Sequence, residues 1–400
     1  MTLGILYHMP FWRAADGTLW ESEGSFARYV DALAPYFDEV VVCVPVFDRP
    51  QTGGCRVRAA NVTLAALPNF PGPRQFYPRL FSMLPRLRAW VRRCDVIHLR
   101  VPTPAAIFAF RMARKTRPVF LLIVGDYAAL RPHLGYRGIK KALFAAYVAF
   151  EEWAVDFMAA RSLTFANGAA LHAKHDASGR RIHQTTTSTL HLDDVAERSG
   201  AFSGGGVRLF TVSRIDPRKG LRVLPAVIGA LRAAGHDARA DVVGPATGQN
   251  GDAERDAIRD EARRLGVEPF VTLCGAVPLD RLMRLYREFD VFVLPTKPGE
   301  GIPRVLLEAM ANGLPVITTA VAGITSLIKH EHNGLLVEGG SAPAIAAAIQ
   351  RLIDDPQLRS RLIENGFQTA RAHTIERQAE QMMAVVANEL ALTLRRRPAA

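Results

Sequence analysis

The chain has 400 residues, of which 49% are hydrophobic and 22% are charged, which is the balance of an ordinary globular protein. Its length favours two domains, each large enough to bury its own core. The formal net charge is +12, but the basic residues are spread along the chain, without zinc-finger spacing or an aromatic RNA-binding signature. Nucleic acid is therefore excluded as the expected partner.

The cysteines and the N-terminal sequence indicate where in the cell the protein is expected. The four cysteines are scattered without metal-ligand spacing, so reduced thiols are expected. The N-terminus lacks a basic region and Pro10 interrupts its apolar stretch, so no signal peptide is expected. Glu151, Glu152 and Asp156 break the longest apolar candidate for a spanning helix. A cytoplasmic location is therefore expected.

Strand-like and helix-like patterns alternate along the first half of the chain. This alternation predicts a parallel sheet with helices on both faces. A helix is expected to begin at Glu23–Phe26, with Gly24 at its start. The expected strands are Leu3–His8, Glu39–Val44, Asp95–Leu99, Val119–Val124 and Leu163–Ala166.

The stretch 197–206, rich in Gly and Ser, is the most linker-like part of the chain. We therefore expect one domain over residues 1–200 and a second over residues 201–374. Both are expected to be α/β domains of the Rossmann-like, doubly wound kind with parallel sheets. The strands expected in the second half are Val207–Val212, Ala240–Val243, Phe270–Cys274, Val291–Leu294 and Pro315–Thr318.

A first chemical motif follows the strand that opens the second half. The strand runs into Arg214, Asp216 and Pro217 make a turn, and Lys219 precedes a helix start. Two cations that converge where a strand ends can hold a diphosphate through charge-assisted hydrogen bonds. A solvated basic turn has the same composition, so charge alone leaves both interpretations open.

A second motif follows the strand 290–294. The chain bends at a glycine-containing loop that carries Glu300, and Pro303 fits the first turn of the next helix. Glu308 then lies one to two turns into that helix, which Gly313 ends. Free N–H groups at the helix start favour an anion, and a carboxylate beside them can bind hydroxyls, as a nucleotide-sugar site requires. The alternative is an ordinary helix whose glutamate stabilises the dipole.

Taken together, the two motifs resemble retaining glycosyltransferases of the GT-B fold, in particular family 4 with its Glu-x7-Glu signature. The residues that carry the resemblance are Pro295, Thr296, Glu300–Pro303, Leu306–Ala311, Gly313, Pro315–Ile317, Ala322–Ile324 and Asn333–Val337. The upstream Ser213-Arg214 and Lys219-Gly220 are similar to the family's diphosphate-binding element. The resemblance is close across residues 207–340 and diffuse across 1–200, the half that normally binds the acceptor.

This resemblance implies two domains that face each other across a cleft, and a last helix from about 375 to 394 that crosses back to the first domain. Residues 375–400 would then be this helix and a basic tail. The implied activity is retaining transfer of a hexose from a nucleotide-diphosphate sugar, UDP- or GDP-linked, to a glycan, lipid-linked or small-molecule hydroxyl. The implied setting is cell-surface polysaccharide or glycoconjugate biosynthesis. No cofactor is implied beyond the nucleotide sugar, and no metal, since the Asp-x-Asp element is absent.

The resemblance also implies roles for single residues. Arg214 and Lys219 would stabilise the departing diphosphate, and Glu300 would bind hydroxyls of the donor sugar. These three form the implied catalytic set. The implied donor-binding residues are Glu308, which would bind the ribose, and Gly301, Ile302, Pro303 and Gly24.

The first half departs from the family at a histidine near the donor sugar, because Val124 stands at that position here. Asp126 could take part of the histidine's role. His98 matches another histidine of the family and is assigned with Asp126 to the acceptor or sugar side, with a structural role as its alternative. Ser326 is a second departure, where the family often has glutamate.

Other classes of protein remain to be separated from this one. A sugar-nucleotide epimerase of the same fold would isomerise the donor alone, and a noncatalytic protein would bind nucleotide without turnover. A Rossmann oxidoreductase needs a glycine-rich fingerprint after a strand, whereas the first strand runs into Tyr7-His8-Met9-Pro10.

The segment Arg79–Arg93 mixes aromatic and basic residues. Such a segment can lie on an anionic bilayer, which would make the protein peripheral on the inner membrane face. The competing interpretation is an ordinary domain helix with a solvated basic face. The sequence leaves both open.

Overall fold

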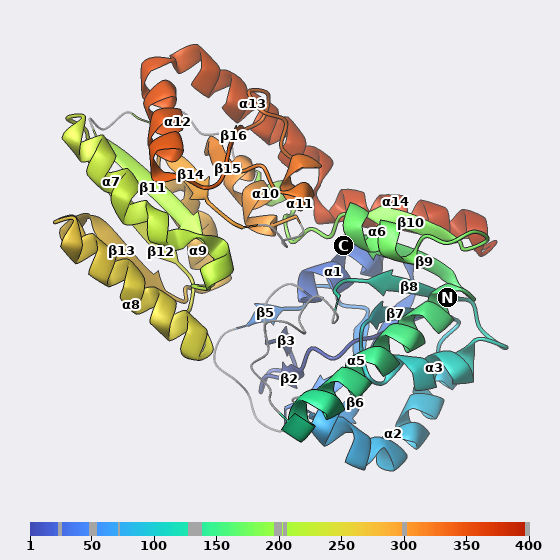
Figure 1. Cartoon of the computed structure of the whole chain (residues 1–400). Helices are drawn as coiled ribbons and strands as arrows, with labels where there is room; N and C mark the ends of the chain where they lie inside the picture. The colour runs from blue at the N-terminus through green and yellow to red at the C-terminus, as the bar shows by residue number, and fades with distance from the viewer. Residues whose placement is uncertain are drawn as a thin grey trace. The chain divides into compact units, whose positions relative to one another are not determined.

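The computed structural model describes residues 1–22, 26–47, 54–70, 73–126, 138–195, 202, 206–297 and 302–396. The chain forms two compact units (Figure 1). Unit 1 comprises Met1–Thr189 and Ile375–Ala400, and unit 2 comprises Leu190–Thr374. We expected the second domain to begin at 201, whereas unit 2 begins at Leu190, and most of the linker-like stretch lies outside the described residues.

Unit 1 is built on one large sheet whose central strands are parallel and nearly fully buried. Its strands are β1 (Thr2–Leu6), β2 (Phe11–Arg13), β3 (Leu19–Glu21), β4 (Glu39–Val46), β5 (Cys55–Arg56), β6 (Val62–Pro68), β7 (Val96–Val101), β8 (Val119–Ile123), β9 (Leu163–Asn167) and β10 (Ile182–Thr185). Their order is β10-β9-β8-β7-β1-β4-β2-β3-β5, and β6 pairs with β4 along its whole length. The pairs β2–β3 and β3–β5 are antiparallel.

Helices cover both faces of this sheet. They are α1 (Phe26–Leu33), α2 (Pro73–Arg93), α3 (Ala106–Ala113), α5 (Gly138–Ala159), α6 (Ala169–His175) and α14 (Ile375–Glu389), with the 3-10 turn η1 (Ala34–Tyr36). One core joins α2, α3 and α5 to the sheet, and a second core joins α1 and α14 to its other face. The last helix of the chain therefore packs within unit 1.

Unit 2 is built on a smaller sheet that is parallel throughout. Its strands are β11 (Gly206–Val212), β12 (Asp237–Val243), β13 (Val271–Gly275), β14 (Val291–Leu294), β15 (Val316–Thr319) and β16 (Leu335–Val337), in the order β13-β12-β11-β14-β15-β16. The chain fills one side of the sheet from β11 to β13 and then crosses to the other side from β14 to β16. The direction of winding thus reverses between β11 and β14.

The helices of unit 2 also lie on both faces of its sheet. They are α7 (Leu224–Ala233), α8 (Gly248–Arg264), α9 (Leu279–Leu285), α10 (Arg304–Ala311), α11 (Ala322–Thr325), α12 (Ala342–Asp354) and α13 (Pro356–Ala372). The 3-10 turns are η3 (Leu192–Asp194), η4 (Pro217–Lys219), η5 (Leu221–Val223), η6 (Glu268–Phe270) and η7 (Tyr286–Glu288). One core contains α7, α8 and α12, and the other contains α9, α10 and α11.

These two parallel-sheet, Rossmann-like units confirm the expected GT-B fold class. Every strand expected from an apolar run is present, with ends that differ by a few residues. The sequence did not predict β2, β3, β5, β6, β10 or β16, most of which are short or only partly buried. No helix among the described residues combines the length and the apolar character needed to cross a bilayer.

Candidate functional site

The reversal between β11 and β14 is where a parallel α/β sheet ordinarily binds its ligand, beyond the carboxyl ends of the strands. The two strands are direct neighbours, with Leu209 opposite Val291 and Phe210 opposite Phe292. Because they are parallel, the segments that leave them emerge at the same edge. The two motifs singled out in the sequence therefore start side by side.

The turn after β11 is held rigidly by Asp216. Its carboxylate accepts a hydrogen bond from the backbone N–H of Arg218 and forms an ion pair with the Arg218 guanidinium at 2.8 Å. The side-chain hydrogen bond from Arg218 lowers the pKa of Asp216 to about 2. Asp216 therefore stays charged at neutral pH and keeps the guanidinium of Arg218 beside it.

This turn is bound to the exit of β14. The N–H of Lys297 donates to the carbonyl oxygen of Arg218 at 2.7 Å, and the Thr296 hydroxyl donates to the same oxygen at 3.2 Å. Gly220 has a left-handed backbone, with φ +67°, and a Cβ built on it would lie 2.1 Å from the carbonyl oxygen of Pro295. Only glycine fits this close approach.

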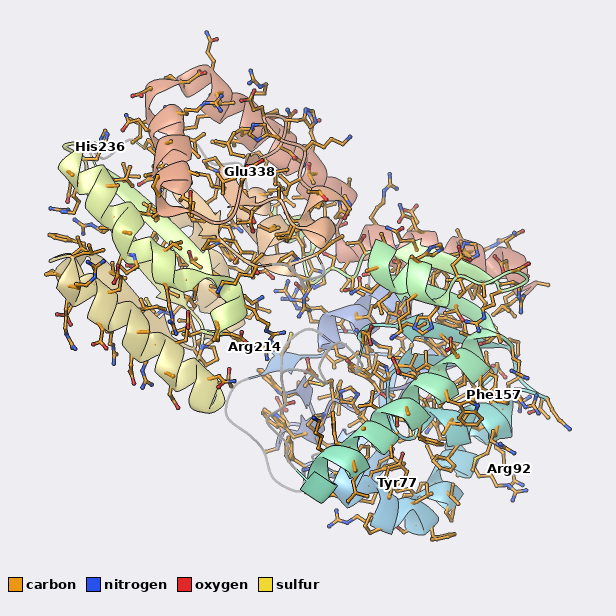
Figure 2. The ribbon with its side chains drawn as sticks, in the orientation of Figure 1. Tyr77, Arg92, Phe157, Arg214, His236 and Glu338 are labelled. Carbon is orange, nitrogen blue, oxygen red and sulfur yellow. The ribbon has the colours of Figure 1, made fainter. Side chains whose placement is uncertain are left out.

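The two predicted cations differ in their surroundings. Arg214 is exposed, and its guanidinium group forms no ion pair with any carboxylate of the described residues (Figure 2). Lys219 is partly buried and ends η4 directly before Gly220. Both stand at the edge where the sheet reverses, which is the arrangement that a diphosphate site needs.

The helix of the second motif is α10, which Pro303 directly precedes and which the left-handed Gly313 follows. Glu308 faces inward on this helix and is only 8% exposed. The hydroxyl of Tyr286 donates to its Oε2 at 2.9 Å. Burial and the nearby Glu308 carboxylate raise the pKa of Tyr286 well above its ordinary value. This bond fixes the position of Glu308, and only a small part of its side chain remains exposed.

Three of the predicted residues, Glu300, Gly301 and Gly24, lie outside the described residues. Ile302 and Pro303 are described and partly exposed, at the start of α10. The structure describes Arg214 and Lys219 after β11, Ile302 and Pro303 directly before α10, and Glu308 within α10.

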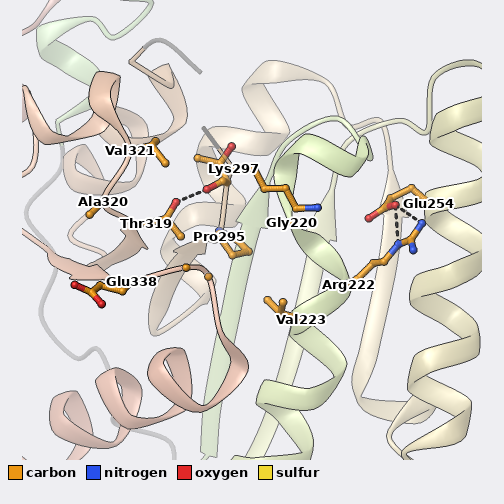
Figure 3. A pocket seen from close by; sticks show the side chains of 13 residues that line it. Gly220, Arg222, Val223, Glu254, Pro295, Lys297, Thr319, Ala320, Val321 and Glu338 are labelled. Atoms are coloured by element: carbon orange, nitrogen blue, oxygen red, sulfur yellow. Dashed lines mark hydrogen bonds and ion pairs between the residues drawn. The ribbon is translucent and has the colours of Figure 1, made fainter. Parts of the chain in front are cut away.

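At this edge lies a hollow of about 380 Å³, lined by segments that follow β11, β14, β15 and β16 and by Glu254 of α8 (Figure 3). Its polar lining includes Lys297, Glu338 and the ion pair between Arg222 and Glu254, whose charged atoms are 2.7 Å apart. Arg214, Lys219 and Glu308 are not among the described residues that line it. The sequence analysis missed this hollow, because its described walls come from five separate segments.

In unit 1, His98 is completely buried on β7. One ring nitrogen lies 2.9 Å from the Tyr29 hydroxyl, and the ring stacks on Phe120. Burial, with a smaller effect of the Arg100 charge, lowers the pKa of His98 to about 3, so the ring is neutral at physiological pH. Its contacts are those of a histidine inside a core.

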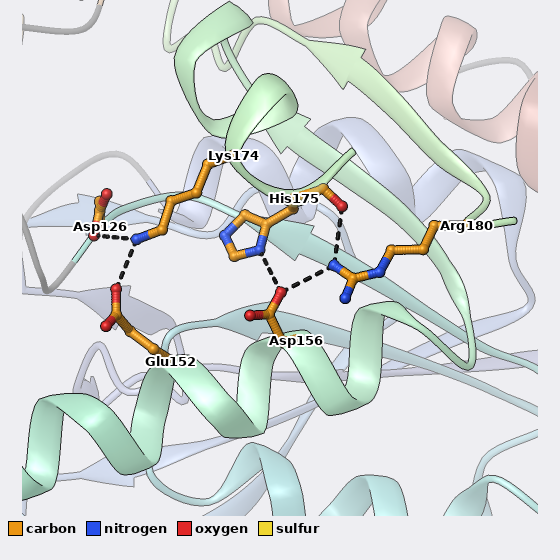
Figure 4. A network of polar contacts seen from close by, with 6 residues as sticks. All are labelled: Asp126, Glu152, Asp156, Lys174, His175 and Arg180. Carbon is orange, nitrogen blue, oxygen red and sulfur yellow. Dashed lines mark hydrogen bonds and ion pairs between the residues drawn. The ribbon is translucent and has the colours of Figure 1, made fainter. Parts of the chain in front are cut away.

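Asp126 follows β8 and belongs to a network of charged side chains (Figure 4). The ammonium group of Lys174 lies 2.9 Å from the Asp126 carboxylate and 2.7 Å from the carboxylate of Glu152. In the same network, Asp156 contacts His175 and Arg180. A cluster of charged side chains thus lies near the carboxyl ends of β7 and β8. Of this cluster, the sequence analysis had assigned only Asp126 to a site.

Comparisons with known proteins agree with the geometry of unit 2. Residues 195–369 match the family described as glycosyl transferases group 1. A D-inositol 3-phosphate glycosyltransferase of Corynebacterium glutamicum is 33% identical over 184 residues, which is 44% of this chain and 43% of that protein. The amylovoran biosynthesis glycosyltransferase AmsK of Erwinia amylovora is 35% identical over 154 residues, 36% of each chain.

The whole fold also has solved counterparts. The crystal structure of HepE from Anabaena, in complex with UDP and glucose, superposes with a TM-score of 0.69 at 18% identity, over 97% of this chain and 100% of that one. This likeness shows a shared fold. In sequence, by contrast, the chain spans about 43% of the first of these curated relatives. The match to the family lies within unit 2, which carries the two motifs described above.

Proposed function

We propose that this protein is a glycosyltransferase that moves a sugar from a nucleotide-diphosphate donor to an acceptor hydroxyl, with retention and without a metal ion. The observation that carries the proposal is the junction of the two motifs. The turn with Arg214 and Lys219 is hydrogen-bonded to the exit of β14, the strand that leads to Glu300. The two cations and the strand after which Glu300 follows in the sequence then belong to one edge of unit 2.

The proposed chemistry relies on charge and position. Arg214 and Lys219 stabilise the negative charge that develops on the leaving diphosphate. Glu300 orients the donor sugar and Glu308 holds the ribose, so the reacting atoms are held at the distance and orientation that the reaction requires. The leaving phosphate helps to deprotonate the acceptor during attack on the same face, so no side-chain base is required. UDP- or GDP-sugars are the proposed donors, and cell-surface glycans are the proposed products.

Thermal denaturation with UDP-, GDP-, ADP- and dTDP-sugars tests donor binding directly. A ligand that binds only the folded state raises the melting temperature by mass action. The proposal expects one nucleotide class to raise it strongly. A protein that none of these sugars stabilises would contradict the proposal.

Glu308 offers a mutational test with a matched control. Glu308→Gln should weaken UDP binding by about 1–3 kcal/mol, because the ribose loses a hydrogen bond to a charged group. Tyr286→Phe removes the bond that holds Glu308, so it should lower the free energy of unfolding with a smaller effect on UDP affinity. Titration calorimetry and urea unfolding measure the two quantities. Equal UDP affinity in wild type and Glu308→Gln would make Glu308 a purely structural residue.

We also propose that unit 1 contacts an anionic membrane surface, through α5 and not through the segment Arg79–Arg93. On α2, the side chains of Met83, Leu87 and Trp90 are buried in the core, while Phe81 is 83% exposed. The apolar stripe of this helix therefore faces inward, and its arginines, such as Arg92, face outward (Figure 2). On these contacts α2 is a domain helix with a basic outer face.

The apolar surface lies instead on α5. Leu143, Phe150 and Trp153 are 67%, 37% and 50% exposed. The ring of Trp153 lies 5.7 Å from that of Phe150 and 5.5 Å from that of Phe157, so the aromatic rings form a continuous row. Arg161 lies at the end of this row, with its guanidinium carbon 4.0 Å from the centroid of the Phe157 ring. An aromatic row with a basic neighbour suits the interface of an anionic bilayer.

Co-sedimentation with liposomes tests this contact. Wild type should pellet with anionic vesicles and less with neutral ones, and high salt should release it. Trp153→Glu should abolish pelleting, because a charge replaces an aromatic side chain in the contact. Leu192→Glu is the matched control, since Leu192 is 55% exposed but lies in unit 2. Recovery of wild type in the supernatant with both vesicle types would leave a protein without membrane contact.

A further inference from the structure

Glu151 on α5 is a buried carboxyl group with an unsatisfied oxygen. Its side chain is 3% exposed, and its Oε1 has no hydrogen-bond partner among the described residues. Buried polar atoms are almost always hydrogen-bonded, so such an atom calls for a ligand or a water. Glu151 lies in unit 1 and is not one of the residues assigned above to the candidate site of unit 2.

The carboxyl group lines a small hollow of about 20 Å³. A space of this size holds one water molecule or one hydroxyl group. Pro102, which follows β7, and Gly125, which follows β8, form part of its wall. The hollow therefore lies beyond the carboxyl ends of parallel strands, the edge at which open α/β sheets bind ligands.

Charged side chains surround the same hollow. Asp126, Glu152 and Lys174 line it and are 26%, 32% and 34% exposed, so they reach both the hollow and the solvent. Carboxylates and an ammonium group together can accept from and donate to neighbouring hydroxyls. The set suits a polyhydroxylated molecule that places one hydroxyl inside and others at the mouth.

Burial raises the pKa of Glu151 to about 7, against a smaller lowering by the Tyr147 hydroxyl. On the α2 side, burial and the Glu151 charge raise the pKa of Tyr77 to about 12. The other titratable groups at the hollow are Asp126, Glu152, Lys174 and His175. Near neutral pH, Glu151 can therefore either donate or accept a hydrogen bond.

We propose that Glu151 binds a hydroxyl group of the acceptor sugar or polyol, with Asp126, Glu152 and Lys174 binding its neighbouring hydroxyls. The inference rests on the proposed glycosyl transfer and names the part of unit 1 that selects the acceptor. Glu151 contributes binding here and takes no proton in the reaction. An acceptor without a hydroxyl at the matching position would lose this contact.

The test compares wild type with Glu151→Gln and Glu151→Leu. Free hexoses, myo-inositol and octyl hexosides serve as acceptor probes, with the nucleotide sugar that stabilises wild type as donor. Glu151→Leu should raise the acceptor KM by about tenfold or more, because a hydrogen bond to a buried group is lost, and leave the donor KM nearly unchanged. Glu151→Gln should keep part of the affinity and lose an inflection near pH 7 in the acceptor KM. Glu380→Gln, on the exposed side of α14, is the control.

Saturation-transfer NMR with the same probes and no donor separates this inference from the proposed function. Probes that bind wild type but not Glu151→Leu support the inference even where no transfer occurs. An unchanged acceptor KM together with unchanged probe binding in Glu151→Leu would overturn it and leave Glu151 as the partner of a structural water. A wild type that binds none of the probes would overturn it as well.

Discussion

Alanine at Arg214 or Lys219 is expected to weaken UDP binding by about tenfold per substitution, the loss of one charge-assisted hydrogen bond of about 1.5 kcal/mol. Charge-assisted hydrogen bonds are worth about 1.5–3 kcal/mol, and the lower value is used because Arg214 is exposed to solvent. UMP binding should change much less, since UMP lacks the second phosphate. Titration calorimetry with both nucleotides measures the difference.

Arg263→Ala is the control for this prediction. It removes the same charge from an exposed position at the end of α8, remote in sequence from both motifs. If Arg263→Ala weakened UDP binding as much as Arg214→Ala, the effect would be one of net charge. Equal losses for UMP and UDP in the Lys219 variant would remove Lys219 from the diphosphate site.

Glutamine at Glu300 is expected to reduce transfer by about a hundredfold or more, because an orienting hydrogen bond that strengthens in the transition state is worth several kcal/mol. UDP carries no sugar, so its affinity should stay near that of wild type. The measurement is kcat/KM for the donor together with the dissociation constant of UDP.

Glu364→Gln, at an exposed position on α13, provides the matched change of charge. Transfer at the wild-type rate in Glu300→Gln would exclude Glu300 from the site. A large loss of UDP affinity in the same variant would place this carboxylate at the nucleotide instead of the sugar.

The meeting of the two motifs at one edge of unit 2 was predictable, because both motifs follow strands. Val207–Val212 and Val291–Leu294 are apolar runs, and parallel strands bring whatever follows them to one edge. The turn at Asp216 and the close approach at Gly220 also have local signals, a side-chain cap and a glycine. What the sequence could not show was that Tyr286 holds Glu308, because this contact depends on the packing of η7 against α10.

The features missed in unit 1 depend on tertiary packing in the same way. β2 and β3 are short antiparallel strands at the side of a parallel sheet, so neither their length nor the α/β pattern marks them. Glu151 interrupts an otherwise apolar stretch of the sequence, yet its side chain is buried. On α2, the spacing of Met83, Leu87 and Trp90 fits a core stripe, and the structure decides between the two interpretations of that segment.

The most direct test of the proposed activity is the product formed from the stabilising nucleotide sugar and the acceptor probes in the presence of EDTA. Proton NMR follows the anomeric signals while released nucleotide diphosphate is quantified. We predict a new glycoside with the anomeric configuration of the donor, formed in equal amount to the released diphosphate and unaffected by EDTA. A donor that is returned unchanged with every acceptor, or converted into an epimeric nucleotide sugar, would contradict glycosyl transfer.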